Sequence, residues 1–239
     1  MRTTALAALV MVAACGGGDD DGGGGGGDID GGAGAEDAAA LDAAAPDAGP
    51  AADLVVLGAR ATASLVIDQQ DFAEGSCALV EGCIGASGTR TLLRFDTVAV
   101  NRGDATLELP VPADGEPWVY GACHDHYHLE GFNRYDLVDG DGNTVAQTRY
   151  DAFCVDDFEP IDDGAADEPV FECGASEPQG LSVGWGWTLA GDGIPCQWID
   201  ITDIEPGDYD LHITVNDDGV GVESDYANNT AVVPVTIPE

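Results

Sequence analysis

The chain has 239 residues and carries 45 acidic side chains against seven basic ones, all of them arginine, for a formal net charge of −38. So strong a negative charge excludes a general affinity for nucleic acid and for anionic membrane surfaces, and it favours cationic or amine-bearing partners. The length leaves room for one or two domains. We expect a monomer.

Residues 1–15, MRTTALAALVMVAAC, predict a lipoprotein signal peptide. The apolar run after Arg2 is too short to span a bilayer but fits a secretory signal. It ends in VAAC, which resembles a bacterial lipobox, with Cys15 as the lipidated first residue of the mature protein. A plain signal peptide with a chance cysteine is the alternative. We therefore expect an exported protein, lipid-anchored at the outer membrane or cell surface, that touches the membrane only through this anchor.

A low-complexity segment, residues 16–52, follows the signal and consists mainly of Gly, Asp and Ala. It has too few large apolar residues to offset the entropy of ordering, so we expect a disordered tether. Residues 53–239 form the predicted folded domain. Its cysteines are Cys77, Cys83, Cys123, Cys154, Cys173 and Cys196. In an exported domain six cysteines predict three disulfides, and their number leaves fifteen pairings open.

The domain alternates apolar and polar residues with a period of two, which predicts strands. Thr91 to Val100 is one such stretch and Tyr209 to Val215 is another. In the second, Tyr209, Leu211, Ile213 and Val215 are expected to face a core, and Asp210, His212 and Thr214 to face water. Short strands with Gly- and Asp-rich loops, and no long helical period, predict an all-β protein with one β-sandwich and long loops.

Two further segments fit the same architecture. DGDGN, Asp139 to Asn143, separates two strand-like stretches and predicts a hairpin turn rather than a calcium loop, because it lacks the later glutamate of an EF-hand. The last stretch, NTAVVPVTI, contains Pro234, which favours an edge strand.

Three of the four histidines stand at alternate positions in CHDHYHLEG: His124, His126 and His128. On a strand they would share one face, and their imidazoles could converge on one ion. Three neutral imidazoles suit zinc, copper, iron or nickel, and an open fourth position is typical of a catalytic site. A polar strand face that happens to be rich in histidine is the alternative. His212 is expected to be exposed and not a ligand.

Several motifs together resemble the catalytic domain of lysyl oxidases, in order, over essentially residues 53–237. These motifs are CALVEGC, TLLRFD, CHDHYHLEGFNRYDLVD, AFC, QGLS, CQWIDITDIEPGDYDL and ESDYANN. The resemblance implies the lysyl oxidase type of β-sandwich and a copper ion on His124, His126 and His128. It also implies oxidative deamination of primary amines such as peptidyl lysine. In the family, that reaction uses a quinone made from one lysine and one tyrosine of the enzyme.

The sequence departs from the family where that quinone is made. The place of the cofactor lysine falls at Tyr150, and the chain contains no lysine at all. Leu189 is nearest the place of the cofactor tyrosine, in a segment without tyrosine, and Arg134 replaces a histidine found in animal members. We therefore expect copper but no lysine tyrosylquinone, which makes amine oxidase activity doubtful and leaves open whether the protein is an enzyme.

Three functions remain open from the sequence. The first is an exported copper-binding protein without amine oxidase activity. The second is a copper-dependent amine oxidase with another cofactor, for which Tyr150 is the quinone candidate. The third is a calcium-stabilised adhesion domain on the cell surface.

The resemblance also implies a calcium site and a disulfide pairing. By analogy with vertebrate relatives, the calcium ligands would be Asp53, Leu54 through its carbonyl, Glu223, Asp225, Asn228 and Asn229. A polar loop without an ion is the alternative. Two family cysteines are missing together, with Trp185 near the place of one, so the other six would keep the family pairing. The implied pairs are Cys77–Cys123, Cys83–Cys196 and Cys154–Cys173.

Overall fold

The computed structural model describes residues 49–239 apart from 114, 153 and 175–176. Cys15, the predicted signal peptide and most of the predicted tether lie outside the described residues. The packed domain begins slightly before the predicted boundary at residue 53. The Ala51 carbonyl accepts a hydrogen bond from the Asp104 amide at 2.9 Å, and the Ala52 carbonyl accepts one from the Ser224 amide at 2.8 Å.

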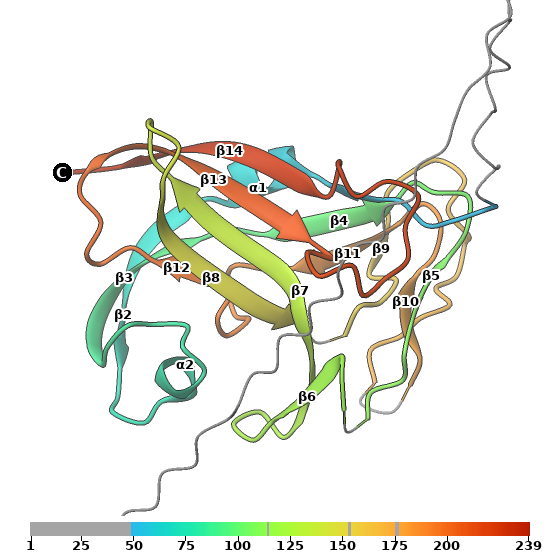
Figure 1. Cartoon of the computed structure of the whole chain (residues 1–239), viewed down its shortest axis with the longest axis horizontal. Helices are drawn as coiled ribbons and strands as arrows, with labels where there is room; N and C mark the ends of the chain where they lie inside the picture. Colours follow the sequence, from blue (N-terminus) through green and yellow to red (C-terminus); the bar gives the residue numbers. More distant parts are fainter. Residues whose placement is uncertain (1–48, 114, 153, 175–176) are drawn as a thin grey trace, which may run out of the picture. The chain divides into compact units, whose positions relative to one another are not determined.

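Antiparallel strands are the main regular structure of the domain, as predicted (Figure 1). The strands are β1 Leu54–Val56, β2 Val66–Phe72, β3 Gly88–Arg94, β4 Thr97–Asn101, β5 Leu107–Leu109, β6 Trp118–Gly121, β7 His126–Val138, β8 Thr144–Ala152, β9 Glu159–Pro160, β10 Gln179–Leu181, β11 Trp185–Leu189, β12 Trp198–Asp200, β13 Gly207–Val215 and β14 Thr230–Ile237. The described helices are short: α1 spans Gly58–Ser64 and α2 spans Cys77–Val80. No helix in the described part of the chain is long and apolar enough to cross a membrane.

Two sheets form the main layers. One has the order β14-β13-β7-β6, with β8 paired to the other edge of β7, and the second has the order β1-β4-β11-β9. Strands β12, β3 and β2 form a further sheet, and β10 pairs with β5. Aromatic side chains fill the space between the main layers. Phe132 of β7 meets Trp187 of β11 edge-on, with ring centroids 5.5 Å apart, and both are fully buried.

A buried polar network ties these layers together at Tyr135, which is fully buried on β7. Its hydroxyl accepts a hydrogen bond from Thr97 and donates one to Gln197, both at 2.9 Å. Its ring also meets Phe95 edge-on with centroids 4.9 Å apart. Because buried polar groups without partners are costly, this pairing fixes how β7 sits on the opposite layer, and β7 carries two of the histidines.

Two strand predictions need correction. The stretch Thr91 to Val100 is not one strand, because the chain breaks at Phe95 and Asp96 between β3 and β4. Phe95 is fully buried, and the Asp96 carboxylate accepts a hydrogen bond from the Gly191 amide at 2.8 Å. Thr214 does not face water either. Strand β14 covers it, and its hydroxyl lies 2.9 Å from that of Thr230.

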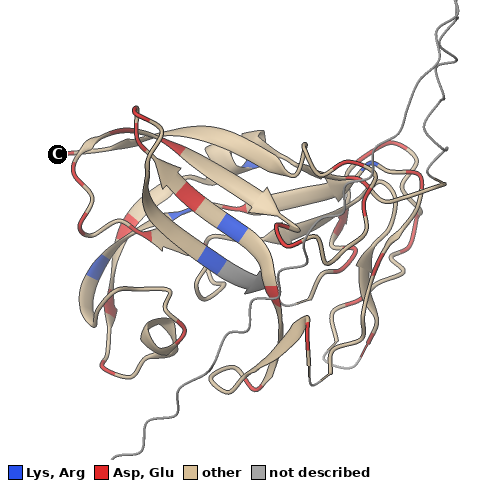
Figure 2. Cartoon of the chain, in the orientation of Figure 1, with Lys and Arg blue, Asp and Glu red and all other residues tan. Residues whose placement is uncertain are grey.

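Other predictions are confirmed. The Asp139 carboxylate accepts hydrogen bonds from the amides of Asp141 and Asn143, at 3.0 and 2.8 Å, which closes the β7–β8 hairpin. Pro234 lies on β14, the edge strand of its sheet. Figure 2 shows that acidic side chains gather mainly on the loops around the sheets. Most of the negative charge therefore lies around the sheets, and few acidic residues are buried.

Candidate metal centre

The three clustered histidines occupy the hairpin that joins β6 to β7. His126 and His128 lie on β7, but His124 lies in the turn before it, so the expectation of three histidines on one strand face is wrong. The Gly121 carbonyl accepts hydrogen bonds from the amides of His124 and Asp125, at 3.0 and 2.9 Å. Asp125 has a φ of 58°, in the left-handed region, and this reverses the chain direction.

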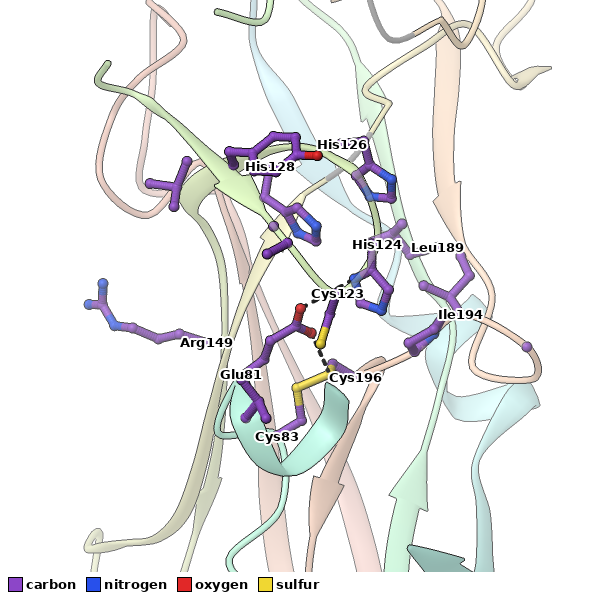
Figure 3. Close-up of a pocket in the computed structure, with 17 residues that line it drawn as sticks. Glu81, Cys83, Cys123, His124, His126, His128, Arg149, Leu189, Ile194 and Cys196 are labelled. Atoms are coloured by element: carbon purple, nitrogen blue, oxygen red, sulfur yellow. Dashed lines mark hydrogen bonds and ion pairs between the residues drawn. A yellow bond between two sulfur atoms is a disulfide. The ribbon is translucent and has the colours of Figure 1, made fainter. Parts of the chain in front are cut away.

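The turn nevertheless brings the three imidazoles together (Figure 3). One ligand nitrogen from each ring lies within 4.8 Å of the others. The ring centroids of His126 and His128 are 4.7 Å apart, and that of His124 is 5.6 and 5.5 Å from them. Nitrogens around one tetrahedral ion stand about 3.3 Å apart, so small side-chain rotations would suffice to close the set. All three rings are partly exposed, which leaves a side open.

Gly121 makes room for this arrangement. A Cβ atom at that position would lie 2.6 Å from Nε2 of His128 and 2.8 Å from its Cδ2. Such contacts are closer than van der Waals packing allows, so a larger residue would displace the ring. Gly121 pairs with His126 across the hairpin, which explains why the sequence keeps a glycine beside the two strand histidines.

Burial and like charges both act on His126. They lower its pKa, with desolvation as the main cause and the neighbouring His128 and His124 as the next. A lowered pKa favours the neutral imidazole, which is the form that binds a metal ion. This property of His126 suits it to act as a metal ligand.

A carboxylate approaches the cluster from the segment around α2. Oε1 of Glu81 lies 3.4 Å from Nδ1 of His124, with the two side chains 25% and 21% exposed. Disulfides lie on both sides of Glu81: Cys77–Cys123 joins α2 to the residue before His124, and Cys83–Cys196 joins the following loop to the segment after β11. Sequence reasoning missed Glu81, whose one signal was its place inside CALVEGC.

Three disulfides are present among the described residues: Cys77–Cys123, Cys83–Cys196 and Cys154–Cys173. These are the pairs that the family resemblance implied, and they are not the pairs that nearness in sequence would suggest, because Cys83 bonds to a residue 113 positions away.

A pocket of about 500 Å³ opens beside the histidines. Its walls include the apolar side chains of Val80, Val119, Leu189 and Ile194. Glu81 and Arg149 add charged groups (Figure 3). A concave, mostly apolar space next to a ligand cluster is the usual form of a small-molecule site. The pocket lies on the open side of the three imidazoles.

Comparison with known proteins identifies the family. A family model described as Lysyl oxidase matches residues 52–238. The chain belongs to the lysyl oxidase family. It is 36% identical to lysyl oxidase homolog 2B of Danio rerio over 178 residues, 69% of this chain and 23% of the relative. It is 34% identical to lysyl oxidase homolog 2 of Homo sapiens over 189 residues, and 35% identical to the human homolog 3 over 188 residues. Each of these two matches covers 75% of this chain and 24% of the relative, so the chain spans about a quarter of these relatives' length.

Leu189 and Tyr150 are the residues expected at the places of the family's two quinone precursors. Leu189 is 3% exposed at the end of β11 and lines the pocket beside the histidines. Tyr150 lies on β8, in register with Asn133 of β7, but its side chain lies outside what the structure describes. Its neighbour Arg149 is in the pocket wall.

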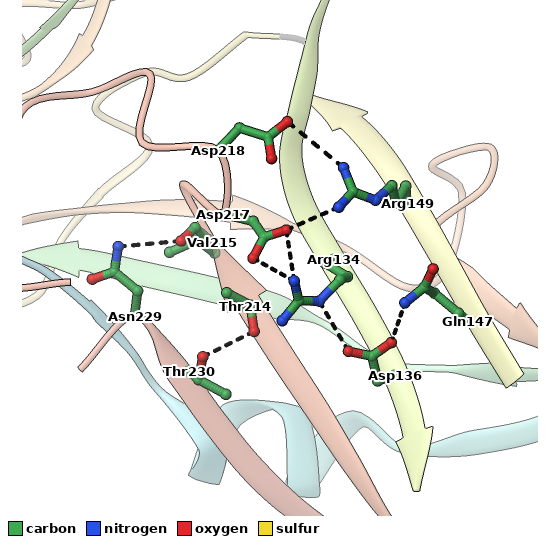
Figure 4. A network of polar contacts seen from close by, with 10 residues as sticks. All are labelled: Arg134, Asp136, Gln147, Arg149, Thr214, Val215, Asp217, Asp218, Asn229 and Thr230. Atoms are coloured by element: carbon green, nitrogen blue, oxygen red, sulfur yellow. Dashed lines mark hydrogen bonds and ion pairs between the residues drawn. The ribbon is translucent and has the colours of Figure 1, made fainter. Parts of the chain in front are cut away.

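Arg134, which stands where animal members of the lysyl oxidase family have a histidine, belongs to an ion-pair network and not to the cluster (Figure 4). It lies directly opposite Arg149 in the β7–β8 register, where two like charges would repel each other. Asp217 lies between them, 2.7 Å from Arg134 and 3.3 Å from Arg149, and Asp136 accepts a further bond from Arg134 at 2.9 Å. These contacts hold the loop after β13 against β7.

The predicted calcium residues gather at another corner, where β1 meets the loop before β14. Glu223 is buried there and accepts hydrogen bonds from the amide of Leu54 at 2.5 Å and from the side-chain amide of Asn229 at 2.8 Å. The Asn228 side chain donates to Asp53 at 2.8 Å. Asp225 is exposed and accepts from the Ala227 amide at 2.8 Å.

Two oxygen atoms at this corner lack partners. The side-chain oxygens of Asn228 and Asn229 are buried and accept no hydrogen bond from any residue that the structure describes. Burial also raises the pKa of Glu223, and this outweighs the hydrogen bonds that lower it. Buried acceptors without donors are unusual and costly, so the corner has the chemistry of a site for a hard cation.

Proposed function

We propose that this protein is an exported copper-binding member of the lysyl oxidase family that lacks the family's lysine-derived quinone. The observation that carries this proposal is the convergence of His124, His126 and His128 beside an open pocket. Three imidazoles with one open side suit copper. The three disulfides of the described part support export, since such bonds persist in oxidising compartments. Lipid anchoring through Cys15 and a monomeric state remain parts of the proposal.

The residues around the cluster fit a copper ion. Gly121 leaves space for the His128 ring, and the lowered pKa of His126 keeps that ring neutral. The pocket gives a small molecule access to the open side of the three rings. Bound there, copper would supply one-electron redox chemistry and a binding position for oxygen or a small anion.

The missing quinone follows from covalent chemistry. The family cofactor needs a lysine nitrogen, and residues 1–239 supply none. Leu189 gives the pocket wall a hydrocarbon side chain where a tyrosine ring would be needed. Without an electrophile to capture the amine, ordinary oxidative deamination has no first step. We therefore propose that amines such as lysine are not turned over.

An amine oxidase with a quinone on Tyr150 is the second candidate. Its support is position alone: Tyr150 follows Arg149, which lines the pocket beside the histidines. This candidate would restore the electrophile that the family function requires, and the experiment below separates it from the first.

We also propose a calcium ion at the corner of Glu223, Asn228 and Asn229, with Asp53, the Leu54 carbonyl and Asp225 as further ligands. The support is the pair of buried asparagine oxygens without donors. Such an ion would link β1 to the loop before β14, so its role would be structural. An adhesion function has no separate observation in its favour.

The test is aerobic loading of the apo-protein with copper, followed by phenylhydrazine treatment and an assay of peroxide release with primary amines. The proposal expects copper uptake, no coloured hydrazone and no amine-dependent peroxide. A hydrazone that maps to the peptide of Tyr150, together with steady peroxide release, would establish the second candidate instead. Failure of copper and zinc to bind at micromolar concentrations would refute the metal centre.

A further inference from the structure

One member of the histidine cluster lacks the support of a strand. His126 and His128 lie on β7, where ladder hydrogen bonds to β6 fix the backbone. His124 lies in the preceding turn, next to Asp125 with its left-handed backbone. A ligand in a turn loses more freedom on metal binding than a ligand on a strand, so His124 has the greatest need for an external anchor.

Glu81 is placed to be that anchor. Its carboxylate oxygen lies 3.4 Å from Nδ1 of His124, a distance that small side-chain movement would shorten to a full hydrogen bond (Figure 3). Among the described residues, the three imidazoles whose ligand nitrogens lie within 4.8 Å of one another form one group, and Glu81 groups instead with Cys83 and Cys196. The carboxylate therefore contacts His124 from outside the group of three imidazoles.

Two disulfides near Glu81 support its role as an anchor of His124. The Cys77–Cys123 disulfide links its segment to the residue adjoining His124, and Cys83–Cys196 holds the other side. The carboxylate and the turn are thus tied to each other across a long sequence separation. A contact held in this way costs little further entropy when it forms.

We propose that Glu81 is a positioning residue of the metal centre. It accepts a hydrogen bond from Nδ1–H of His124, which leaves Nε2 of that ring as the ligand atom and fixes the orientation of the ring. Carboxylates that hold metal-bound histidines in this way typically contribute 10- to 100-fold to metal affinity. The proposal rests on the proposed copper function.

The test compares Glu81→Ala, Glu81→Gln and Glu130→Ala with the wild-type protein. Glu130 is a matched control, because it lies on β7, is exposed, and lines a second hollow together with Glu81. Removing it changes the local charge equally, while the contact between Glu81 and His124 stays in place. Copper affinity is measured by competition with a chelator, and the His124 tautomer of the apo-protein by nitrogen-15 NMR.

Glu81→Ala should weaken copper binding about 10- to 100-fold and release His124 from the Nδ1–H tautomer. Glu81→Gln should recover part of the affinity, because its amide oxygen still accepts a hydrogen bond but carries no charge. Glu130→Ala should bind copper within about threefold of wild type, a change that screening of exposed charges permits. A purely structural role for Glu81 would lower the melting temperature without changing the tautomer, and would contradict the proposal.

Two failures are distinguishable. If the wild-type protein binds copper and Glu81→Ala binds it equally well, Glu81 is not a positioning residue and the metal centre stands. If the wild-type protein binds no copper, both this proposal and the proposed function fall. Should Glu81→Ala fail to fold, Glu81→Gln carries the test, and an unchanged affinity together with an unchanged tautomer would overturn the proposal.

Discussion

The histidine hairpin and the Glu223 corner are both polar sites at the ends of strands, but they are built for different tasks. The imidazoles are partly exposed, face a pocket and belong to a single hairpin. The Glu223 side chain and the side-chain oxygens of Asn228 and Asn229 are buried, and this corner joins both ends of the domain, since β1 and the loop before β14 meet there. An ion at the first site would be open to ligands, whereas an ion at the second would hold the chain together.

This difference shows that the exposure and the ligand type of a metal-binding cluster determine whether a bound ion can react or only stabilise the fold. Soft nitrogen ligands with one open side permit exchange of small molecules and electron transfer. Hard oxygen ligands that are largely buried do not permit such exchange. A cation bound to them would satisfy buried acceptors that otherwise lack partners. Loss of the first ion should therefore change reactivity with little effect on folding, and loss of the second should do the reverse.

The largest effect is expected at the hairpin. His126→Ala removes the central imidazole of the cluster and should weaken copper binding by more than about 100-fold, beyond the usual effect of outer-shell residues. The melting temperature of the apo-protein should stay within a few degrees of wild type, because the ring is partly exposed. Isothermal titration and a thermal melt measure both. Tight copper binding by this variant would place the metal elsewhere.

The Cys77–Cys123 disulfide, beside His124, should affect both the stability of the domain and its copper affinity. Replacing both Cys77 and Cys123 with Ala should cost about 4 kcal/mol of stability by loop entropy and also weaken copper binding. Replacing both Cys154 and Cys173 should cost about 3 kcal/mol but leave copper affinity unchanged, because neither cysteine lines the pocket beside the histidines. Urea unfolding and copper titration of both pairs test this. Equal copper affinity in the two variants would show that the hairpin does not depend on its anchor.

At the other corner, stability is the expected readout. Glu223→Ala removes the acceptor of the buried Leu54 amide and one acceptor each of the buried Asn216 and Asn229 side-chain amides, so it should destabilise the domain by about 3 kcal/mol. It should also abolish any rise in melting temperature on addition of calcium. Asp225→Ala is the control: its exposed carboxylate should matter for calcium affinity and hardly at all for the stability of the apo-protein. A calcium-dependent melt that survives Glu223→Ala would refute this corner as the site.

The smallest effect on stability is expected at an acidic pair, Asp156 and Asp157, that belongs to neither the histidine hairpin nor the Glu223 corner. Burial, followed by the charge of Asp157, raises the pKa of Asp156 from 3.8 to about 6. The fold therefore favours its neutral form, so the stability it contributes is present below pH 3.8 and is lost as the pH rises through 6. Asp156→Asn should raise stability by about 1–2 kcal/mol at pH 8, after allowance for partial solvent exposure, and by nothing at pH 3.

Thermal melts of Asp156→Asn at the two pH values, with and without calcium, complete this comparison. The gain at pH 8 should be independent of calcium, in contrast to the effects at Glu223. A gain of equal size at pH 3 would mean that the substitution acts through packing and not through charge.

The local patterns of the sequence predicted features that depend on neighbouring residues. The Asp139–Asn143 turn, the edge position of Pro234 and the clustering of the histidines each follow from a short pattern. The break between β3 and β4 was missed, because Phe95 and Asp96 keep the alternation of a strand while Asp96 bonds to a distant amide. The turn position of His124 was missed because nothing in CHDHYH signals a left-handed Asp125.

Contacts between residues far apart in the sequence could not be predicted from local sequence patterns. Glu81 reaches His124 only because the Cys77–Cys123 disulfide folds its segment onto the hairpin. The family resemblance implied that disulfide, but no spacing within the chain reveals the carboxylate beside the imidazole. Likewise, Asp217 between Arg134 and Arg149 depends on the register of three strands.

The central claim is a copper centre without a quinone, and native mass spectrometry of the domain after aerobic loading with copper tests it most directly. We predict one bound copper ion that is lost on acid denaturation, leaving the unmodified chain with its three disulfides. No bound copper, or a covalent mass change that remains after acid treatment and maps to the peptide containing Tyr150, would contradict the account.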